Sequence, residues 1–305
     1  MKIKLIALCF LYHFICIHVN SQICEKEASF FCEESMLKHL KSLSSDAFEG
    51  RRTGTRGALK ARKYIINQFY SLNVLPLGKN YEQPFLFVEK RKQYKAINIL
   101  GLIKGTKNPH EYIIISAHYD HEGIKKGAIY NGADDNASGL SALFSFGEYF
   151  KNNPPKHSVI LAAFDGEELG LQGSKYFVKN SIIPLKNIKV NINMDMIGRS
   201  EKNELFVVGT EHNKKLKYAV SYCQHSKKIK LIEGHNDSDA LENWTYSSDH
   251  MNFYKKGIPF LYFGVEDHKD YHEPTDDYEN IHPKFYVEAV NVIVSVFKKI
   301  DTLKF

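Results

Sequence analysis

Hydrophobic positions along the chain follow two patterns, and the order of these patterns predicts the fold. Short apolar runs have the length of buried strands, and longer segments repeat apolar residues every three or four positions, as on one face of a helix. The expected strands cover residues 112–117, 158–164, 189–195, 205–208 and 258–263. The expected helices cover residues 36–43, 57–73, 138–150, 214–223 and 283–299. Strands that alternate with helices indicate an α/β fold whose central sheet is mixed, mostly parallel and covered by helices on both faces.

Nothing in the pattern divides the chain into separate units. The sequence has no internal repeat, low-complexity tract or linker rich in proline and glycine. We therefore expect one domain over residues 22–305, in which residues 22–105 form an N-terminal segment packed on the same domain. In sheets of this kind, functional groups gather at the carboxyl ends of the strands.

The N-terminus has the pattern of a targeting segment. Lys2 and Lys4 precede an apolar run over residues 5–16, and Val19 and Ser21 supply small side chains before a cut after Ser21. This predicts a cleaved signal peptide over residues 1–21 and export to the periplasm or the extracellular space. The apolar run is shorter than the roughly 20 residues that span a bilayer, so we expect no stable membrane span after cleavage, with an uncleaved anchor as the alternative.

Composition and charge narrow the function classes. The 305 residues are 43% hydrophobic and 25% charged, as in a globular protein. The formal charge of +6 falls to +4 when Lys2 and Lys4 leave with the signal peptide. The basic residues are dispersed rather than interleaved with aromatic residues, which argues against a nucleic-acid partner.

Cysteine usage leaves one disulfide as a candidate. Of the five cysteines, Cys24, Cys32 and Cys223 remain after loss of the signal peptide. Cys24 and Cys32 form the plausible pair in an oxidising compartment, although connectivity cannot be read from sequence.

Polar clusters follow several of the expected strands, and most of them have an ordinary explanation when taken alone. His118 could be a plain polar residue, and the adjacent Glu167 and Glu168 could form a solvated turn. Helix capping would explain Asn136 or Ser138, but not the two adjacent acids before them, whose repulsion a metal ion would compensate. Together they supply two histidines and three carboxylates from successive strand ends. Such a set suits a pair of divalent ions, and zinc accepts nitrogen and oxygen ligands of this kind.

At this point the sequence closely resembles metallopeptidase family 28, the di-zinc aminopeptidases. The resemblance extends from about residue 40 to the C-terminus and includes the segment Ser45-Asp46-x-Phe48-x-Gly50-Arg51-Arg52-x-Gly54. Five ordered motifs carry it: His118-Tyr119-Asp120, Gly132-x-x-Asp135-x-x-Ser138-Gly139, Gly166-Glu167-Glu168-x-Gly170-x-x-Gly173-Ser174, Asn193-Met194-Asp195-Met196-Ile197-Gly198 and Tyr271-His272-x-Pro274-Thr275-Asp276.

The resemblance implies two Zn²⁺ ions per chain and a role for each motif residue. His118 and Glu168 would belong to separate ions, and Asp195 and His272 would complete one ion each. Asp135 would bridge them, because the family's bridging acid lies four positions before the glycine of the Ser-Gly pair, which excludes Asp134. Relatives typically have a cis peptide after this residue. Asp120 would orient His118, and Glu167 would be the general base. The Tyr271 hydroxyl would contact the oxyanion of the transition state.

These roles imply an exported zinc-dependent aminopeptidase that acts on peptides with a free N-terminus. Glu167 would take a proton from a water bridging two ions about 3.5–4 Å apart. A glutaminyl cyclase, which is a single-zinc aminoacyl transferase on the same fold, and a di-zinc carboxypeptidase or dipeptidase are the alternatives. A non-catalytic scaffold is disfavoured because all five ligand positions and the base are intact.

Other residues carry weaker expectations. Trp244, Tyr246 and Phe253 are candidates for the specificity pocket, although core positions would explain them equally well. Arg199 is expected to pair with a site carboxylate, and His121 and His268 could line the mouth of the site. Ser247 or Ser248 is expected to cap a helix that runs to residue 254, which is a better explanation than a serine triad with the adjacent Asp249 and His250.

Overall fold

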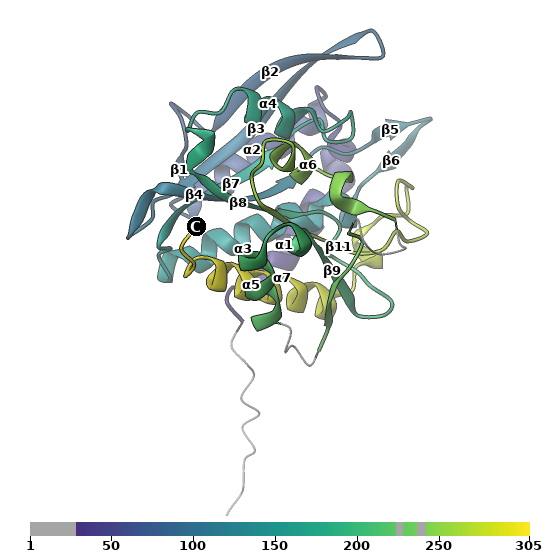
Figure 1. The fold of residues 1–305 in the computed structure, drawn as a ribbon. Coiled ribbons are helices and arrows are strands. Elements are labelled where there is room, and N and C mark those ends of the chain that lie inside the picture. Colours follow the sequence, from purple (N-terminus) through teal and green to yellow (C-terminus); the bar gives the residue numbers. More distant parts are fainter. Residues whose placement is uncertain (1–28, 224–227, 237–241) are drawn as a thin grey trace, which may run out of the picture.

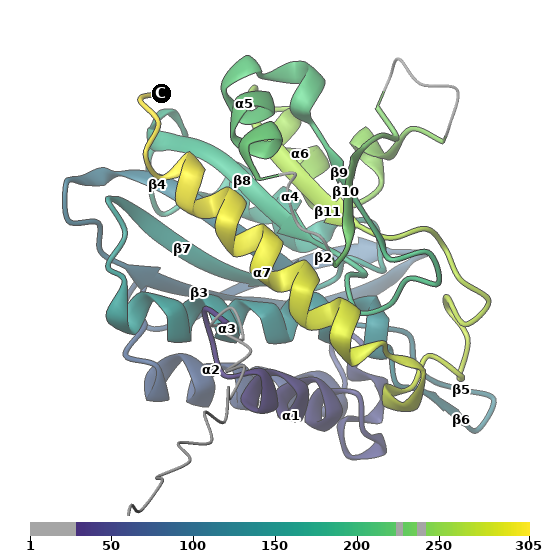
Figure 2. The same ribbon diagram turned by 90° about the horizontal axis from the view of Figure 1, so that it is seen from below.

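A computed structural model describes residues 29–223, 228–236 and 242–305. A nine-stranded sheet crosses the molecule in the order β1-β3-β7-β4-β8-β11-β9-β10, with β2 also paired to β3 (Figures 1 and 2). Its strands are β1 (Leu75–Pro76), β2 (Glu82–Glu89), β3 (Lys92–Ile103), β4 (Asn108–His118), β7 (His157–Phe164), β8 (Ile188–Met194), β9 (Glu204–Val208), β10 (Lys230–Glu233) and β11 (Phe260–Gly264). A separate hairpin joins β5 (Gly123–Lys125) to β6 (Ala128–Tyr130).

The four strands β7, β4, β8 and β11 run parallel at the centre of the sheet. The antiparallel pairs lie to either side, where β3 meets β7 and β9 meets β11. The predicted mixed α/β fold, with a parallel centre, is therefore confirmed.

Helices cover both faces of the sheet (Figure 2). The α-helices are α1 (Glu33–Leu43), α2 (Arg56–Ser71), α3 (Gly139–Asn152), α4 (Gln172–Lys179), α5 (Lys214–Tyr222), α6 (His250–Tyr254) and α7 (Pro283–Ile300). Short helical turns are η1 (Asp46–Arg51), η2 (Ala133–Ser138), η3 (Leu185–Asn187), η4 (Thr210–His212), η5 (Trp244–Tyr246) and η6 (Tyr278–Asn280).

Alternation along the central strands divides the core into two layers. On β4, Ile113 and Ile115 pack into the layer that contains α1, α2, α3, α5 and α7. Ile114 points to the opposite layer, where Phe177 of α4 and Phe253 of α6 are buried. Because both faces are covered, the central strands are mostly apolar, although β8 also carries the buried side chains of Asn191 and Asn193.

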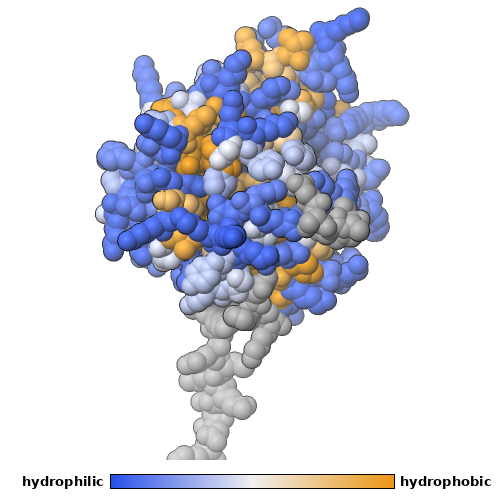
Figure 3. Space-filling view, viewed as in Figure 1, coloured by the Kyte–Doolittle hydropathy of each residue, from blue (hydrophilic) through white to orange (hydrophobic). Residues whose placement is uncertain are grey.

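The N-terminal segment contains an element that the hydrophobic pattern does not predict. Strands β2 and β3 form a long antiparallel hairpin from Glu82 to Ile103. Leu86 and Val88 of β2 are more than half exposed. Figure 3 shows a hydrophobic patch at the top of the molecule, on the side where Figure 1 labels β2. Buried or half-buried positions alternate with exposed ones along β2, but the exposed positions are the apolar residues Pro84, Leu86 and Val88. The sequence therefore lacks the alternation of apolar and polar residues that would predict this strand.

The predicted signal peptide and Cys24 lie outside the described residues. Within the described part of the chain, no helix combines the length and apolar character that crossing a membrane requires.

Candidate metal centre and active site

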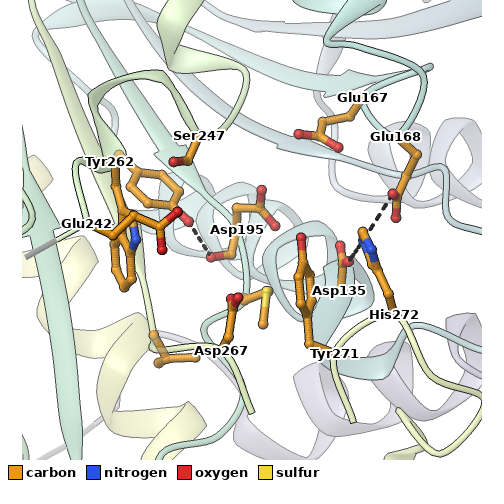
Figure 4. Close-up of a pocket in the computed structure, with 13 residues that line it drawn as sticks. Asp135, Glu167, Glu168, Asp195, Glu242, Ser247, Tyr262, Asp267, Tyr271 and His272 are labelled. Carbon is orange, nitrogen blue, oxygen red and sulfur yellow. Dashed lines mark hydrogen bonds and ion pairs between the residues drawn. The ribbon is translucent and has the colours of Figure 1, made fainter. Parts of the chain in front are cut away.

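The central parallel strands end on one side of the sheet, where acidic and histidine side chains meet. His118 is the last residue of β4, Asp195 follows β8, Glu167 and Glu168 follow β7, and His272 comes from the loop after β11. Together with Asp135 from the η2 turn, the carboxylates and His272 line a cavity of about 290 Å³ (Figure 4), and His118 contacts two of the lining residues, Asp135 and Asp195. Its other lining residues are Met196, Glu242, Trp244, Ser247, Tyr262, Val265, Asp267 and Tyr271.

Three side chains that could act as metal ligands lie close together on one side of this site, and we call them the first donor group. His118 Nε2 lies 3.2 Å from Asp135 Oδ1 and 3.1 Å from Asp195 Oδ1. His118 is almost fully buried, and its Nδ1 lies 3.1 Å from the main-chain carbonyl oxygen of Asp120. That contact fixes which ring nitrogen faces the two carboxylates.

A second group forms around the other oxygen of Asp135. His272 Nε2 lies 3.2 Å from Asp135 Oδ2 and 3.1 Å from Glu168 Oε2. Asp135 therefore presents one oxygen to His118 and the other to His272. Among the predicted residues, it is the one whose carboxylate joins the two groups.

The donor atoms suit divalent ions. Two ligands bound tetrahedrally to zinc at about 2.0–2.1 Å lie about 3.3–3.4 Å apart, close to the four separations of 3.1–3.2 Å measured here. Glu168 Oε1 is also buried without a hydrogen-bond partner among the described residues. The groups His118–Asp135–Asp195 and Asp135–Glu168–His272 can thus each hold one ion.

The electrostatics of the cluster favour positive charge. Burial would lower the pKa of His118, but the carboxylates of Asp195 and Glu167 outweigh it and raise that pKa well above its usual value. Burial likewise opposes protonation of His272, yet its contacts with Asp135 and Glu168 raise its pKa to about 10. Metal ions bound here would be stabilised by the same negative charges and would replace the protons on His118 and His272.

Glu167 belongs to neither group and projects into the cavity beside them (Figure 4). Its burial, together with the charges of Asp195 and Glu168, raises the pKa of the carboxyl well above its usual value, against the opposing effect of His118. Its backbone N–H donates to Asp120 Oδ1 at 3.1 Å. A carboxylate with a raised proton affinity next to candidate metal ligands has the properties expected of a general base.

The carboxylate of Asp120 lies near His118 and also contacts other segments of the site. Its Oδ1 lies 3.8 Å from His118 Nδ1, and the closer contact to that nitrogen is made by the main-chain carbonyl. The carboxylate also accepts hydrogen bonds from the backbone N–H of Glu167 and from the Thr53 hydroxyl, each at 3.1 Å. Asp120 therefore links the loop after β4 to the turn that carries both glutamates.

The glycine-flanked turn separates the two adjacent acids. Asp134 faces away from the donor groups, accepting from the backbone of Gly198 at 2.6 Å and contacting His268 Nε2 at 3.1 Å. Asp276 accepts from the backbone N–H groups of both Asp134 and Asp135. The peptide that joins Asp135 to Asn136 is cis.

Comparison with known proteins places this geometry in a family. The sequence model of peptidase family M28 matches residues 98–297, which is more than half of the chain. The protein belongs to peptidase family M28. The resemblance found in the sequence is therefore confirmed.

Curated relatives of this M28 chain are longer than it is. Aminopeptidase YwaD of Bacillus subtilis is 31% identical over 207 residues, which cover 65% of this chain and 43% of YwaD. A probable zinc metalloprotease of Pyrenophora tritici-repentis is 26% identical over 227 residues, 60% of this chain and 48% of that protein. The M28 chain spans about half the length of the curated relatives it matches.

Solved structures with the same fold include two kinds of enzyme. The zinc aminopeptidase BSAP from Bacillus subtilis superposes with a TM-score of 0.69 at 18% identity, covering 90% of this chain and 97% of that one. Porphyromonas gingivalis glutaminyl cyclase gives a TM-score of 0.76 at 17% identity and covers 90% and 100% of the two chains. An aminopeptidase and a glutaminyl cyclase therefore share the fold of this chain.

Ser248 supports the M28 site in a way that the sequence does not reveal. The predicted helix cap at Ser247 or Ser248 is wrong, because the cap position of α6 is Asp249. The Ser248 hydroxyl instead donates to Asp195 Oδ2 at 2.7 Å and accepts from Asn193 Nδ2 at 3.0 Å. No local motif could identify this contact, since it joins segments more than fifty residues apart.

The remaining candidates are divided between the cavity and its surroundings. Tyr271 lines the cavity with its ring stacked on His272, and Trp244 is also a lining residue. Phe253 is a core residue, and Tyr246 is about half exposed outside the lining. Arg199 pairs with Asp270 at 2.7 Å, next to Tyr271 in the chain.

Proposed function

We propose that the protein is an exported zinc-dependent aminopeptidase that removes N-terminal residues from peptides. Two zinc ions would be held, one by His118, Asp135 and Asp195, and the other by Asp135, Glu168 and His272. The support is the geometry of the two donor groups and membership of a family whose named relatives include aminopeptidases and zinc metalloproteases.

Bound zinc would supply Lewis acidity and lower the pKa of water. Glu167 would accept a proton from the attacking water at its carboxylate and return it to the leaving amine. Asp120 would hold the backbone of Glu167 in place through the 3.1 Å hydrogen bond. Tyr271, which borders the same cavity, would present its hydroxyl to the developing oxyanion.

The charge of the cavity is the observation that favours an aminopeptidase. Its described lining includes the carboxylates of Asp135, Glu167, Glu168, Asp195, Glu242 and Asp267 and contains neither lysine nor arginine. A substrate's α-ammonium group would be attracted to such a surface. A carboxypeptidase needs a cation for the substrate's terminal carboxylate, and Arg199 is already engaged by Asp270 and Glu201 outside the lining.

A glutaminyl cyclase also acts on a free N-terminus, and the Porphyromonas gingivalis cyclase shares the fold. The presence of two donor groups that share Asp135 favours a two-ion hydrolase over an enzyme that uses a single zinc. The two reactions give different products, because the cyclase releases ammonia and leaves every peptide bond intact.

One purified sample tests the proposal. We expect two zinc ions per chain and release of the first residue from peptides with a free N-terminus, but not from N-acetylated peptides. Shortening of blocked peptides from the C-terminus would contradict the aminopeptidase assignment. Pyroglutamate formation from glutaminyl peptides, without hydrolysis and with one zinc per chain, would replace it by a cyclase.

Export is tested separately, by sequencing the N-terminus of protein recovered from outside the cytoplasm. Cleavage after Ser21 is expected, and an intact Met1 on the recovered protein would contradict cleavage of the signal peptide.

A further inference from the structure

His121 is fully buried against the second donor group and is not one of the five ligands implied by the family resemblance. It follows Asp120 in the loop after β4. Its Nδ1 lies 2.7 Å from Glu168 Oε1 and 3.6 Å from Asp135 Oδ2. The sequence places this histidine at the mouth of the site, but the structure places it inside.

Polar atoms around His121 are left without ordinary partners. Neither ring nitrogen of His121 has a hydrogen bond of adequate geometry within the described part of the chain, and the same is true of Glu168 Oε1. Burying such atoms unpaired is costly. A nitrogen and an oxygen that lie close together without hydrogen-bond geometry can instead be two metal-ligand atoms that bind the same cation.

The surroundings hold the His121 ring in this position. Gly132 packs directly against it, so that a Cβ at this residue would lie 2.5 Å from the ring carbon Cδ2. Gly132 also has a φ of +55°, which few other residues adopt at low cost. The buried guanidinium of Arg51 binds the carbonyl oxygens of Gly132 and Tyr119 at 2.9 Å each, fixing the two segments that enclose the ring.

We propose that His121 Nδ1 is an additional protein ligand of the metal ion held by Asp135, Glu168 and His272. This rests on the proposed function, which supplies the ion. The two ions would then differ, since His121, Asp135, Glu168 and His272 give one of them four protein donors. The ion at His118, Asp135 and Asp195 would have three and keep a position open, the pattern that separates closed from catalytic zinc sites.

The alternative is that His121 only positions Glu168 through a direct contact. A positioning residue of this kind typically changes metal affinity by about 10–100-fold, and it contributes no imidazole to the metal. Counting imidazoles on the ion therefore separates the two roles without measuring activity.

The decisive sample is His118→Asn protein, stripped with a chelator and reloaded with one equivalent of zinc. The substitution removes a donor from the first group, so the zinc is expected at Glu168 and His272. X-ray absorption at the zinc edge should then show two imidazole ligands per zinc, and only one in the His118→Asn/His121→Asn double variant. One imidazole in both proteins would overturn the proposal.

Zinc affinity provides a second measurement on otherwise unaltered protein. Competition with a chelator should show that His121→Asn weakens one of the two ions more than about 100-fold, beyond what a positioning residue explains. His157→Asn is the matched control, because His157 is equally buried but pairs with Asp301 at the opposite end of β7. Weakening of 100-fold or less in His121→Asn would contradict the proposal.

Failure of the proposed function would have a different signature. Wild-type protein that binds two zinc ions but hydrolyses no peptide would leave the imidazole count meaningful and contradict only the aminopeptidase assignment. Two zinc ions with normal hydrolysis and a single imidazole at the second site would contradict only the role of His121.

Discussion

Glu167 and Glu168 are neighbours in the chain, yet their carboxyl groups have opposite electrostatic surroundings. Burial and the charge of Asp135 would raise the pKa of Glu168, but its contacts with His121 and His272 bring it down to about 2. Within the described residues, no histidine makes such a contact with Glu167, and burial raises its pKa. One side chain is held as an anion and the other has an increased affinity for a proton, which is the difference between a ligand and a general base.

Replacing Glu167 by glutamine tests this division of roles. The amide has nearly the same shape but cannot take a proton, so we expect kcat to fall about 10²–10⁴-fold while both zinc ions remain. Turnover and zinc per chain should be measured on the same sample. Glu111→Gln, a change at a partly exposed glutamate paired with Lys189, is the control and should leave both unchanged. A zinc-replete Glu167→Gln enzyme with normal kcat would exclude Glu167 as the base.

Ser248 acts on the site through Asp195. Because its hydroxyl binds the oxygen of Asp195 that His118 does not contact, Ser248→Ala should weaken zinc binding at the first group about 10–100-fold. Chelator competition measures this loss, and Ser248→Thr should recover most of it. Ser221→Ala, on the exposed face of α5, should have no effect. Equal zinc affinities in all three variants would show that the contact contributes nothing.

At the scale of elements, the turn η1 joins the N-terminal segment to the loops of the site. Glu49, Gly50 and Arg51 have φ values of +52°, +64° and +50° in succession, an unfavourable conformation for the two residues that have side chains. The fully buried Arg51 offsets this cost by donating to the carbonyl oxygens of Leu43, Tyr119, Asn131 and Gly132 at 2.6–2.9 Å. One side chain therefore holds α1, the loop after β4 and the loop before Asp135 together.

Arg51→Lys should show how much these four hydrogen bonds contribute to the free energy of unfolding. Lysine cannot reproduce the planar set of donors, and buried carbonyl groups would be left unpaired, so the free energy of unfolding should fall by about 2–4 kcal/mol. Urea unfolding at fixed zinc concentration measures the change. Arg52→Lys is the neighbouring control, since the half-exposed Arg52 pairs with Glu122 and should cost about 1 kcal/mol or less. Similar losses in both variants would contradict a special role for Arg51.

Element prediction from the sequence succeeded where burial is strong and failed where it is weak. Strands β4 and β7, covered on both faces, are visible as apolar runs. The hairpin of β2 and β3 is missed because the solvent-facing positions of β2 are apolar, so residue type does not alternate with burial. Helix α7 is predicted to within one residue of its end, since a proline begins it and its buried stripe extends along its whole length.

At the scale of the whole molecule, the fold explains which parts of the site a sequence can reveal. Residues that follow parallel strands, such as His118 and Asp195, meet at one edge of the sheet, and their motifs are compact enough to recognise. The contacts that orient them come from elsewhere in the chain. Thr53 reaches Asp120 and Asp165, and Arg51 reaches Gly132, so these roles depend on packing that no single segment encodes.

The pH dependence of the free energy of unfolding should reveal the titration of a buried histidine that is not one of the candidate metal ligands. His250 is fully buried between the rings of Phe260 and Tyr262, with Nε2 2.9 Å from the carbonyl oxygen of Trp244. Burial lowers its pKa from 6.5 to about 3. Below pH 6.5 the imidazole of His250 is therefore protonated in the unfolded chain, whereas in the folded protein it stays neutral down to about pH 3. This group's contribution to stability is complete above pH 6.5 and is lost as the pH falls toward 3, by up to about 1.4 kcal/mol per pH unit.

Urea unfolding of wild-type, His250→Gln and His110→Gln proteins between pH 4 and pH 7, at saturating zinc, measures this contribution. His250→Gln should be less stable at pH 7, because a packed ring is lost, but its stability should fall less steeply with acid than that of the wild type. His110 is exposed, so His110→Gln should follow the wild-type slope. Because zinc release affects all three proteins alike, the difference in slope isolates His250, and equal slopes in His250→Gln and the wild type would show that this buried ring is not the source of the acid sensitivity.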